Sequence, residues 1–245
     1  MKKAYFIFPI LTLLIMWFLL SFFKIINPLF LPRPDFVFIE ILKLILSGSI
    51  FFDLFHTLYR LFLSFILSVL IGVPLGLLIG YYKKLYSAFS FLIDFFRSIP
   101  PMALFPLFLL FFGIGDLTKI AIVVFSCSLI IIVNTAYGVR IVPKSQIILA
   151  KTFKANKFQI FSKIILPSSL INLFSSFRII FSLCLMMIIV LEMFVGTRIG
   201  LGYRIINAQW LYKTIELYSF IILTGLIGYI FNKIFILIER RITPP

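Results

Sequence analysis

Long apolar runs, uncharged apart from one arginine in the fifth, are separated by basic or proline-containing segments and divide the chain into six candidate membrane helices. A helix needs about 20 apolar residues to cross a hydrocarbon core about 30 Å thick, and most of these runs approach that length. The pattern therefore predicts an all-α integral membrane protein with six transmembrane helices. The runs cover residues 4–23, 61–82, 98–115, 120–139, 164–191 and 217–232, and the last is expected to extend to about residue 238.

The third run is expected to contain a bent helix, because Pro100 and Pro101 stand near its start. Proline removes a helical hydrogen bond and clashes with the preceding turn, so a helix that begins before this pair should bend there. Asp94 and Arg97 precede the prolines at a spacing of three residues. That spacing places the two side chains next to each other on a helix.

The segment before the second run, residues 24–57, contains three prolines and charges of both signs. These features predict an extramembrane loop with one surface helix. We therefore divide the chain into a first span with its loop, residues 1–56, and a transmembrane domain, residues 57–241. Small residues in the second run permit close helix packing in lipid, and they include Gly72, Gly76 and Gly80.

Composition agrees with a membrane protein and excludes a soluble domain. Hydrophobic residues make up 62% and charged residues 13% of the 245 positions, whereas a soluble domain has about half and a quarter. The net charge of +15 raises the question of nucleic-acid binding, but no base-reading motif accompanies the basic residues. With the N-terminus inside, the cytoplasmic segments hold twelve Lys and Arg, against seven on the other side. Because basic residues concentrate on the cytoplasmic side, both termini are predicted there.

The sequence contains no recognisable catalytic or metal-binding constellation. Cys127 and Cys184 lie in separate uncharged runs and His56 is the one histidine, whereas metal sites and disulfide frameworks need clustered ligands. The eight carboxylates are scattered, and no nucleophile has a base in view. We therefore predict a protein that is not an enzyme and that binds no cofactor on this chain.

The basic loop between the fourth and fifth runs carries the most information. From Arg140 to Lys163 it holds six basic residues and no acidic one, with apolar residues at helical spacing. Asn156 and Gln159 have the spacing of a capping box, which predicts two short helices that meet near Ala155. Two interpretations fit this pattern: a basic amphipathic helix on the inner leaflet, or a helix that docks in the groove of a cytoplasmic partner.

The run LAKTFKANKFQIFSKIILP, residues 149–167, resembles the cytoplasmic signature of bacterial ABC importer permeases. In that family the motif reads roughly E-A-A, three residues, G, and later I-x-L-P. Lys154 stands at the family's glycine, and the ending at Ile164, Leu166 and Pro167 keeps its distance from that position. Residues 71–80, 95–120, 134–140 and 191–203 resemble the nitrate, sulfonate and taurine branch of the same family.

The resemblance implies the type I fold of ABC importer permeases, with a cytoplasmic coupling loop over residues 141–166. It implies a bacterial inner-membrane subunit with three kinds of partner: cytoplasmic ABC ATPases, an outer substrate-binding protein and a second permease copy. ATP and Mg would be bound by the ATPase, because this chain lacks the phosphate loop G-x-x-x-x-G-K-[ST]. A side chain at Lys154 should disfavour a positive φ, which would move the turn toward Asn156. The candidate ATPase-coupling residues are Ala150, Lys151, Thr152, Phe153, Lys154, Ala155, Asn156 and Phe158.

Polar residues inside the predicted spans are candidates for a translocation pathway. A charge such as Arg178 costs at least about 2.5 to 3.5 kcal/mol in a membrane unless it faces the interior or has a partner. Arg178 therefore either pairs with a carboxylate or carbonyl oxygens, or lines an anion path, since guanidinium suits sulfonate and nitrate. Asn134 and Thr135 either form interhelical hydrogen bonds or line the pathway. Glu192, at the outer end of its span, is expected to be solvated, with closure of an outer gate as the alternative.

The sequence thus predicts a permease subunit of an ATP-driven importer for a small anion such as a sulfonate, taurine or nitrate. A thiamine-pyrimidine precursor or another small solute is an alternative cargo. A gradient-driven secondary transporter is a rival class, although the chain lacks clear paired broken helices and midplane carboxylates. A membrane scaffold that anchors a cytoplasmic protein through the basic loop is the second rival.

Overall fold

The computed structural model of the chain describes residues 4–194, 196 and 198–242, and all regular structure in these residues is helical. The all-α prediction is therefore confirmed. The elements are α1 (Ala4–Phe22), α2 (Pro34–Leu46), α3 (Phe51–Tyr81), α4 (Lys83–Arg97), η1 (Pro101–Leu104), α5 (Phe105–Phe112), α6 (Asp116–Arg140), α7 (Lys144–Thr152), α8 (Lys157–Ile160), the π-helix η2 (Phe161–Ile165), α9 (Leu166–Phe194), α10 (Leu201–Trp210) and α11 (Thr214–Ile242).

Four helices in the described part of the chain are long and apolar enough to cross a membrane: α3, α6, α9 and α11. A fifth candidate is the pair formed by α4 and the helix through residues 101–112, which is bent by 88° at the predicted prolines. The fully described part of α1, Phe8–Phe22, is a shorter apolar helix. The predicted bend is thus confirmed, while the count of six spans stays a prediction.

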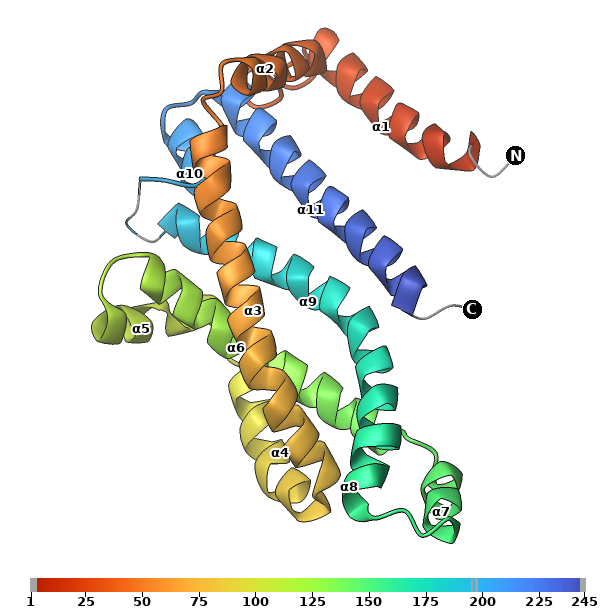
Figure 1. The fold of residues 1–245 in the computed structure, drawn as a ribbon. Helices are drawn as coiled ribbons and strands as arrows, with labels where there is room; N and C mark the ends of the chain where they lie inside the picture. Colours follow the sequence, from red (N-terminus) through yellow and green to blue (C-terminus); the bar gives the residue numbers. More distant parts are fainter. Residues whose placement is uncertain (1–3, 195, 197, 243–245) are drawn as a thin grey trace.

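Helix α3 crosses the molecule from top to bottom in Figure 1 and packs most extensively against α6. Its contact face is a stripe of small and polar residues at helical spacing, which ends in three glycines. A Cβ atom added at Gly76 would lie 2.5 Å from Cβ of Thr135 and 2.8 Å from the carbonyl oxygen of Ile132. The glycines therefore bring the two backbones into direct contact, as the sequence predicted.

The central core joins α3, α6 and α9. Leu61, Ile131 and Ile188 contribute one fully buried side chain from each of these helices. Phe65, on α3, packs edge-on against Phe181 on α9 with ring centroids 5.2 Å apart. Because α3 begins at Phe51, well before the uncharged run at residue 61, the charged first turns of the helix belong to this packed unit.

The N-terminal helix α1 extends away from the bundle and meets it at the upper end in Figure 1, where it contacts α2 and where Trp17 stacks on Tyr218 of α11 with ring centroids 5.8 Å apart. The expected surface helix is α2, whose buried face includes Val37 and Ile41. The indole N–H of Trp17 donates to the carbonyl oxygen of Pro32 at 2.9 Å. The hydroxyl of Tyr218, on α11, donates to the carbonyl oxygen of Phe30 at 3.0 Å. These bonds tie the loop between α1 and α2 to its neighbours.

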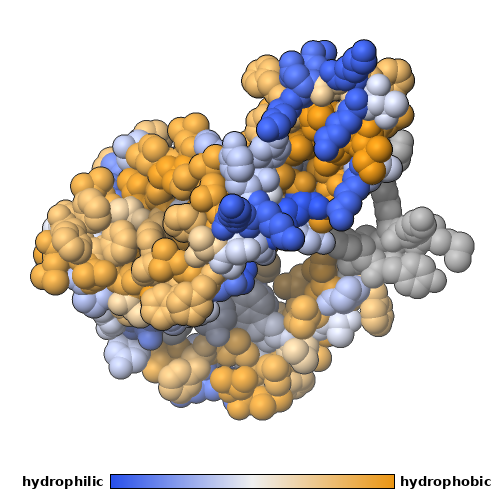
Figure 2. Space-filling model, turned by 90° about the horizontal axis from the view of Figure 1, so that it is seen from below, coloured by the Kyte–Doolittle hydropathy of each residue, from blue (hydrophilic) through white to orange (hydrophobic). Residues whose placement is uncertain are grey.

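The helices α7 and α8 project at the opposite end of the molecule, below α6 and α9 in Figure 1. Seen from below, a protruding lobe on this side carries many of the strongly hydrophilic side chains, next to apolar ones (Figure 2). This end contains the basic loop whose residues the sequence singled out. The projecting basic surface therefore lies at one end of the molecule, and α2, with the adjoining ends of α3 and α11, lies at the other end.

Candidate coupling surface and translocation site

The basic loop folds into two short helices joined by a tight turn, as predicted. The backbone N–H of Gln159 donates to Oδ1 of Asn156 at 2.8 Å, and the N–H of Asn156 donates to Oε1 of Gln159 at 2.9 Å. This reciprocal pair is a complete capping box, and it satisfies two backbone donors that the start of a helix leaves without partners. The capping box fixes the direction in which α8 leaves the turn.

The turn itself corrects the expectation for Lys154. The backbone of Lys154 has a φ of +54°, in the left-handed region that glycine adopts at little cost. The N–H groups of Lys154 and Ala155 donate to the carbonyl oxygens of Lys151 and Ala150, at 2.9 and 3.0 Å. These bonds close the C-terminus of α7 in the way a left-handed cap does. The turn keeps its position at Lys154 and does not move to Asn156, because the cap bonds outweigh the strain.

Large apolar side chains on and next to this turn are exposed. Phe153 is 79% exposed and Phe158 is 76% exposed, which is unusual for phenylalanine unless a partner or lipid covers it. Lys151, Thr152, Lys154 and Asn156 are also exposed, while Ala150 and Ala155 are half-buried. The candidate coupling residues therefore share one projecting surface, with the two alanines at its base.

The base of this surface is anchored in the membrane bundle. Ile160 and Ile165 are buried against Val139 of α6, and Ala150 and Ala155 pack on the same cluster. The segment Phe161–Ile165 between α8 and α9 is a π-helix, a form that often marks functional positions. A displacement of α8 would therefore reach α6 and α9 through packed side chains.

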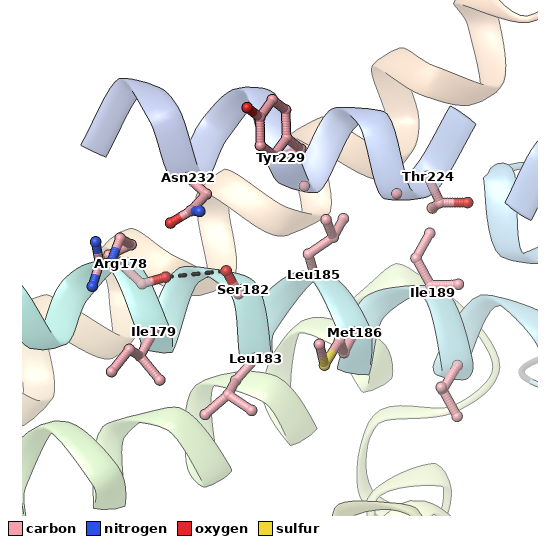
Figure 3. Close-up of a pocket in the computed structure, with 13 residues that line it drawn as sticks. Arg178, Ile179, Ser182, Leu183, Leu185, Met186, Ile189, Thr224, Tyr229 and Asn232 are labelled. Atoms are coloured by element: carbon pink, nitrogen blue, oxygen red, sulfur yellow. Dashed lines mark hydrogen bonds between the residues drawn. The ribbon is translucent and has the colours of Figure 1, made fainter. Parts of the chain in front are cut away.

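A cavity of about 670 Å³ lies between α9 and α11. It exists because α11 presents Gly225 and Gly228 toward α9: a Cβ added at Gly225 would meet nothing within 4 Å. Most of the wall is aliphatic, from side chains such as Leu185 and Ile189. Figure 3 shows the polar minority, in which Arg178 and Asn232 lie at the same end of the cavity on facing helices.

The Arg178 guanidinium forms no hydrogen bond or ion pair with any residue that the structure describes. Its backbone carbonyl oxygen accepts a 3.2 Å hydrogen bond from the Ser182 hydroxyl (Figure 3). Of the two interpretations of Arg178, pairing with a carboxylate is therefore not found in the described residues. Arg178 lies on the cavity wall, and its role in an anion path stays a prediction.

The remaining pathway candidates do not share this cavity. Thr135 is 1% exposed, in the contact between α3 and α6, and its hydroxyl has no hydrogen-bond partner among the described residues. Asn134 is half-buried on α6. Neither forms the interhelical hydrogen bond expected for it within the described part of the chain. The structure thus separates Asn134 and Thr135 from Arg178.

The expectation of a solvated Glu192 is wrong. Glu192 is 1% exposed, and its carboxylate accepts hydrogen bonds from Nη1 of Arg60 at 2.5 Å and from the Thr57 hydroxyl at 2.9 Å. The backbone N–H of Gly202 donates to the same carboxylate at 3.0 Å. The cause is the early start of α3, which brings Thr57 and Arg60 to the end of α9. A buried carboxylate with these donors needs no water.

Several members of this ion cluster were not predicted from the sequence. Nε of Arg60 lies 2.8 Å from Oδ1 of Asp116, and Nζ of Lys119 lies 3.5 Å from the same oxygen. Two turns earlier on α3, Asp53 accepts bonds from Nε of Arg204 at 2.7 Å and from the Gly200 N–H at 2.8 Å. Gly200 has a φ of +126°, and its hydrogen atom faces the Glu192 carboxylate, so no side chain fits there.

The missed residues had a recognisable pattern. Asp53, Thr57 and Arg60 continue, at helical spacing, the stripe of small residues that runs down α3 to its glycines. The sequence analysis began the second span at residue 61, directly after Arg60, because a charge is costly in a membrane. The stripe shows that the charged turns face other helices and therefore belong to the same helix.

The helical bundle, the cavity and the projecting basic surface define a multi-span membrane transport subunit. The model of the family described as binding-protein-dependent transport system inner membrane component matches residues 72–244, so the chain belongs to this family. It is accordingly a permease subunit of an ABC importer, the transport component of such a system.

Named relatives support the sulfonate, taurine and nitrate branch. The chain is 27% identical over 231 residues to a Bacillus subtilis protein named as the aliphatic sulfonates transport permease SsuC, covering 94% of this chain and 83% of that one. It is 26% identical over 238 residues to the taurine transport system permease protein TauC of Escherichia coli, covering 95% and 86%.

A solved structure has the same fold. The chain matches a structure titled as an inward-facing conformation of the MetNI methionine ABC transporter, with a TM-score of 0.68. The match covers 78% of this chain and 94% of that chain at 22% sequence identity. The likeness confirms the fold of an ABC importer permease.

Proposed function

We propose that this permease subunit carries a small organic or inorganic anion, of the sulfonate, taurine or nitrate type, inward across the inner membrane. The cavity between α9 and α11 forms part of its path, and the Arg178 guanidinium binds the anionic group in transit. The names of the relatives favour this cargo, because they include a sulfonate and a taurine permease.

The observation that carries the proposal is the environment of Arg178. A guanidinium without a partner in the described residues lies on the wall of a largely aliphatic cavity. Such a charge is costly unless an anion or water accompanies it. Guanidinium donates two parallel hydrogen bonds to planar or tetrahedral oxyanions, so sulfonate and nitrate match its geometry. The side chain of Asn232, on the facing helix, supplies a further donor.

The energy for transport comes from a separate chain in this proposal. Two cytoplasmic ATPases bind ATP and Mg and contact the α7–α8 surface through Phe153 and Phe158, which need a cover. An outer substrate-binding protein delivers the anion, and a second permease copy completes the pathway as a homodimer. Both termini lie in the cytoplasm, which places the exposed lysines of the α7–α8 surface on the side where basic residues concentrate.

Uptake of a labelled alkanesulfonate, with and without Arg178→Gln, tests the cargo. The variant is expected to reduce uptake by about 10- to 100-fold, the value of a lost charged hydrogen bond, while the amount of assembled complex stays constant. Arg178→Lys should retain part of the uptake, because the charge remains. Arg97→Gln is the matched control, since that arginine forms an exposed ion pair with Asp94. Unchanged uptake in Arg178→Gln, or loss of the folded protein, contradicts the proposal.

Purification of the tagged chain in mild detergent, followed by mass spectrometry, tests the partners. A nucleotide-binding subunit in stoichiometric amount is the expected result. A permease recovered alone from membranes that contain the transporter would contradict the proposed ATPase partnership.

A further inference from the structure

A second cavity, of about 570 Å³, lies between the lower end of α3 and the segment α8–η2. Its polarity changes along its length. Leu77 and Leu78 form the apolar part, Tyr81 and Tyr82 follow at the end of α3, and Lys157 is the one cationic side chain that lines it. This order matches the change from hydrocarbon to headgroups across one leaflet, where tyrosine and lysine concentrate at the interface.

The charge around this groove has one sign. Lys83 and Lys84 follow Tyr82 directly, and both are exposed, as is Lys157. No acidic residue occurs in the sequence between Asp53 and Asp94, or between Asp116 and Glu192. The described residues form no ion pair with these three lysines. An anion with an apolar tail is therefore the complementary ligand.

We propose that this groove binds an anionic glycerophospholipid of the adjacent leaflet. One acyl chain lies along Leu77 and Leu78, and the phosphate contacts the Lys157 ammonium. The tyrosines at the end of α3 separate the two parts. Unlike the general attraction of basic loops to the membrane surface, this is a defined site with an apolar and a polar section.

The lipid would contact α8, which the proposed function assigns to ATPase coupling. Only this link to coupling rests on the proposed function; the lipid site itself does not. Tyr81 packs edge-on against Phe161 of η2, with ring centroids 5.5 Å apart. Phe158 lines the same groove from α8. A bound lipid therefore fills the space between α3 and α8 and holds the coupling surface against the bundle.

Native mass spectrometry of the full chain, purified with its co-purifying subunits, tests the site. Phosphatidylglycerol and phosphatidylcholine with identical acyl chains are the probes. The wild type is expected to retain phosphatidylglycerol in preference. Lys157→Gln should lower that preference by about fivefold, the contribution of one lysine near an anionic headgroup. Lys144→Gln, an exposed lysine outside the groove, is the matched control and should leave the preference unchanged.

A second variant fills the apolar section of the groove and leaves the charge of Lys157 in place. Leu78→Trp is expected to reduce the retention of both lipids, because the indole occupies the acyl-chain section. Equal retention of the two lipids by the wild type, or equal effects of Lys144→Gln and Lys157→Gln, would overturn the proposal. So would loss of the bound lipid when the ATPase associates, since the groove would then belong to that partner. Lipid retention is read without any transported anion, so its failure is separable from failure of the proposed function.

Discussion

Nη1 of Arg60 lies 2.5 Å from Oε1 of Glu192, and both side chains are almost fully buried. The two residues are 132 positions apart in the sequence and join α3 to the end of α9. Arg60 also donates to the carbonyl oxygen of Ile199 at 3.0 Å, so the pair holds the segment that leads into α10. Arg60 therefore joins α3, α9 and the segment before α10 at one point.

Removal of either partner should destabilise the protein strongly. Arg60→Met leaves Glu192 buried without its cation, and Glu192→Leu leaves the guanidinium without one of its carboxylates. Each single change is expected to cost about 3 to 5 kcal/mol, as is typical when a buried ion pair is broken. The measurement is the free energy of unfolding in mild detergent, monitored through the loss of the helical circular-dichroism signal.

The double variant, Arg60→Met with Glu192→Leu, measures the coupling energy between the two side chains. Since both single changes remove the same contact, the double variant should cost less than the sum of the two. Arg97→Met provides the control, because its ion pair with Asp94 is exposed and should contribute less than about 1 kcal/mol. Strictly additive costs would show that Arg60 and Glu192 act independently.

A methyl group at Gly76 should separate α3 from α6. The added Cβ would overlap Thr135 and the carbonyl oxygen of Ile132, and overpacking of this kind costs about 1 to 3 kcal/mol. Gly225→Ala, in the same type of helix but facing open space, should be neutral or slightly stabilising. Melting temperatures of the two variants in one detergent make the comparison, and similar values would exclude the close contact.

Replacement of Lys154 by glycine should stabilise the turn between α7 and α8. A left-handed backbone costs an L-residue about 1 to 2 kcal/mol, and glycine does not have this cost. Amide hydrogen exchange over residues 149–160 is expected to slow in Lys154→Gly. In Lys151→Gly, where the backbone is helical, exchange should become faster. Faster exchange in both variants would mean that the left-handed strain at Lys154 is negligible.

A charge on the exposed phenylalanines should prevent ATPase binding without disturbing the membrane bundle. Phe153→Asp or Phe158→Asp is expected to abolish co-purification of the nucleotide-binding subunit, because each buries a carboxylate in the proposed interface. Insertion into the membrane should be unchanged, since both side chains are largely exposed and lie outside the central core. Phe153→Leu keeps an apolar contact and should retain the partner. Association that survives both aspartate variants would exclude this surface as the docking site.

Local features of the fold were predictable because they depend on neighbouring residues. The proline bend after Arg97 and the capping box at Asn156 each follow from side chains within a few positions. The glycine face of α3 follows from helical spacing. The left-handed Lys154 was not predicted, because the backbone bonds that hold it form only when α7 ends there.

The sequence by itself determined that this chain forms apolar helices in a membrane, that a helix bends at the prolines, and where a basic loop with two short helices lies; it did not predict α10 or the early start of α3. These properties come from local hydrophobic periodicity, proline and glycine placement, and charge. Only the tertiary structure decided that Glu192 is buried against Arg60, that Thr135 faces Gly76, and that Arg178 lines a cavity opposite Asn232. The physical reason is distance along the chain: burial and pairing depend on side chains brought together from helices far apart in sequence, and hydrophobic periodicity carries no information about which helix supplies the partner.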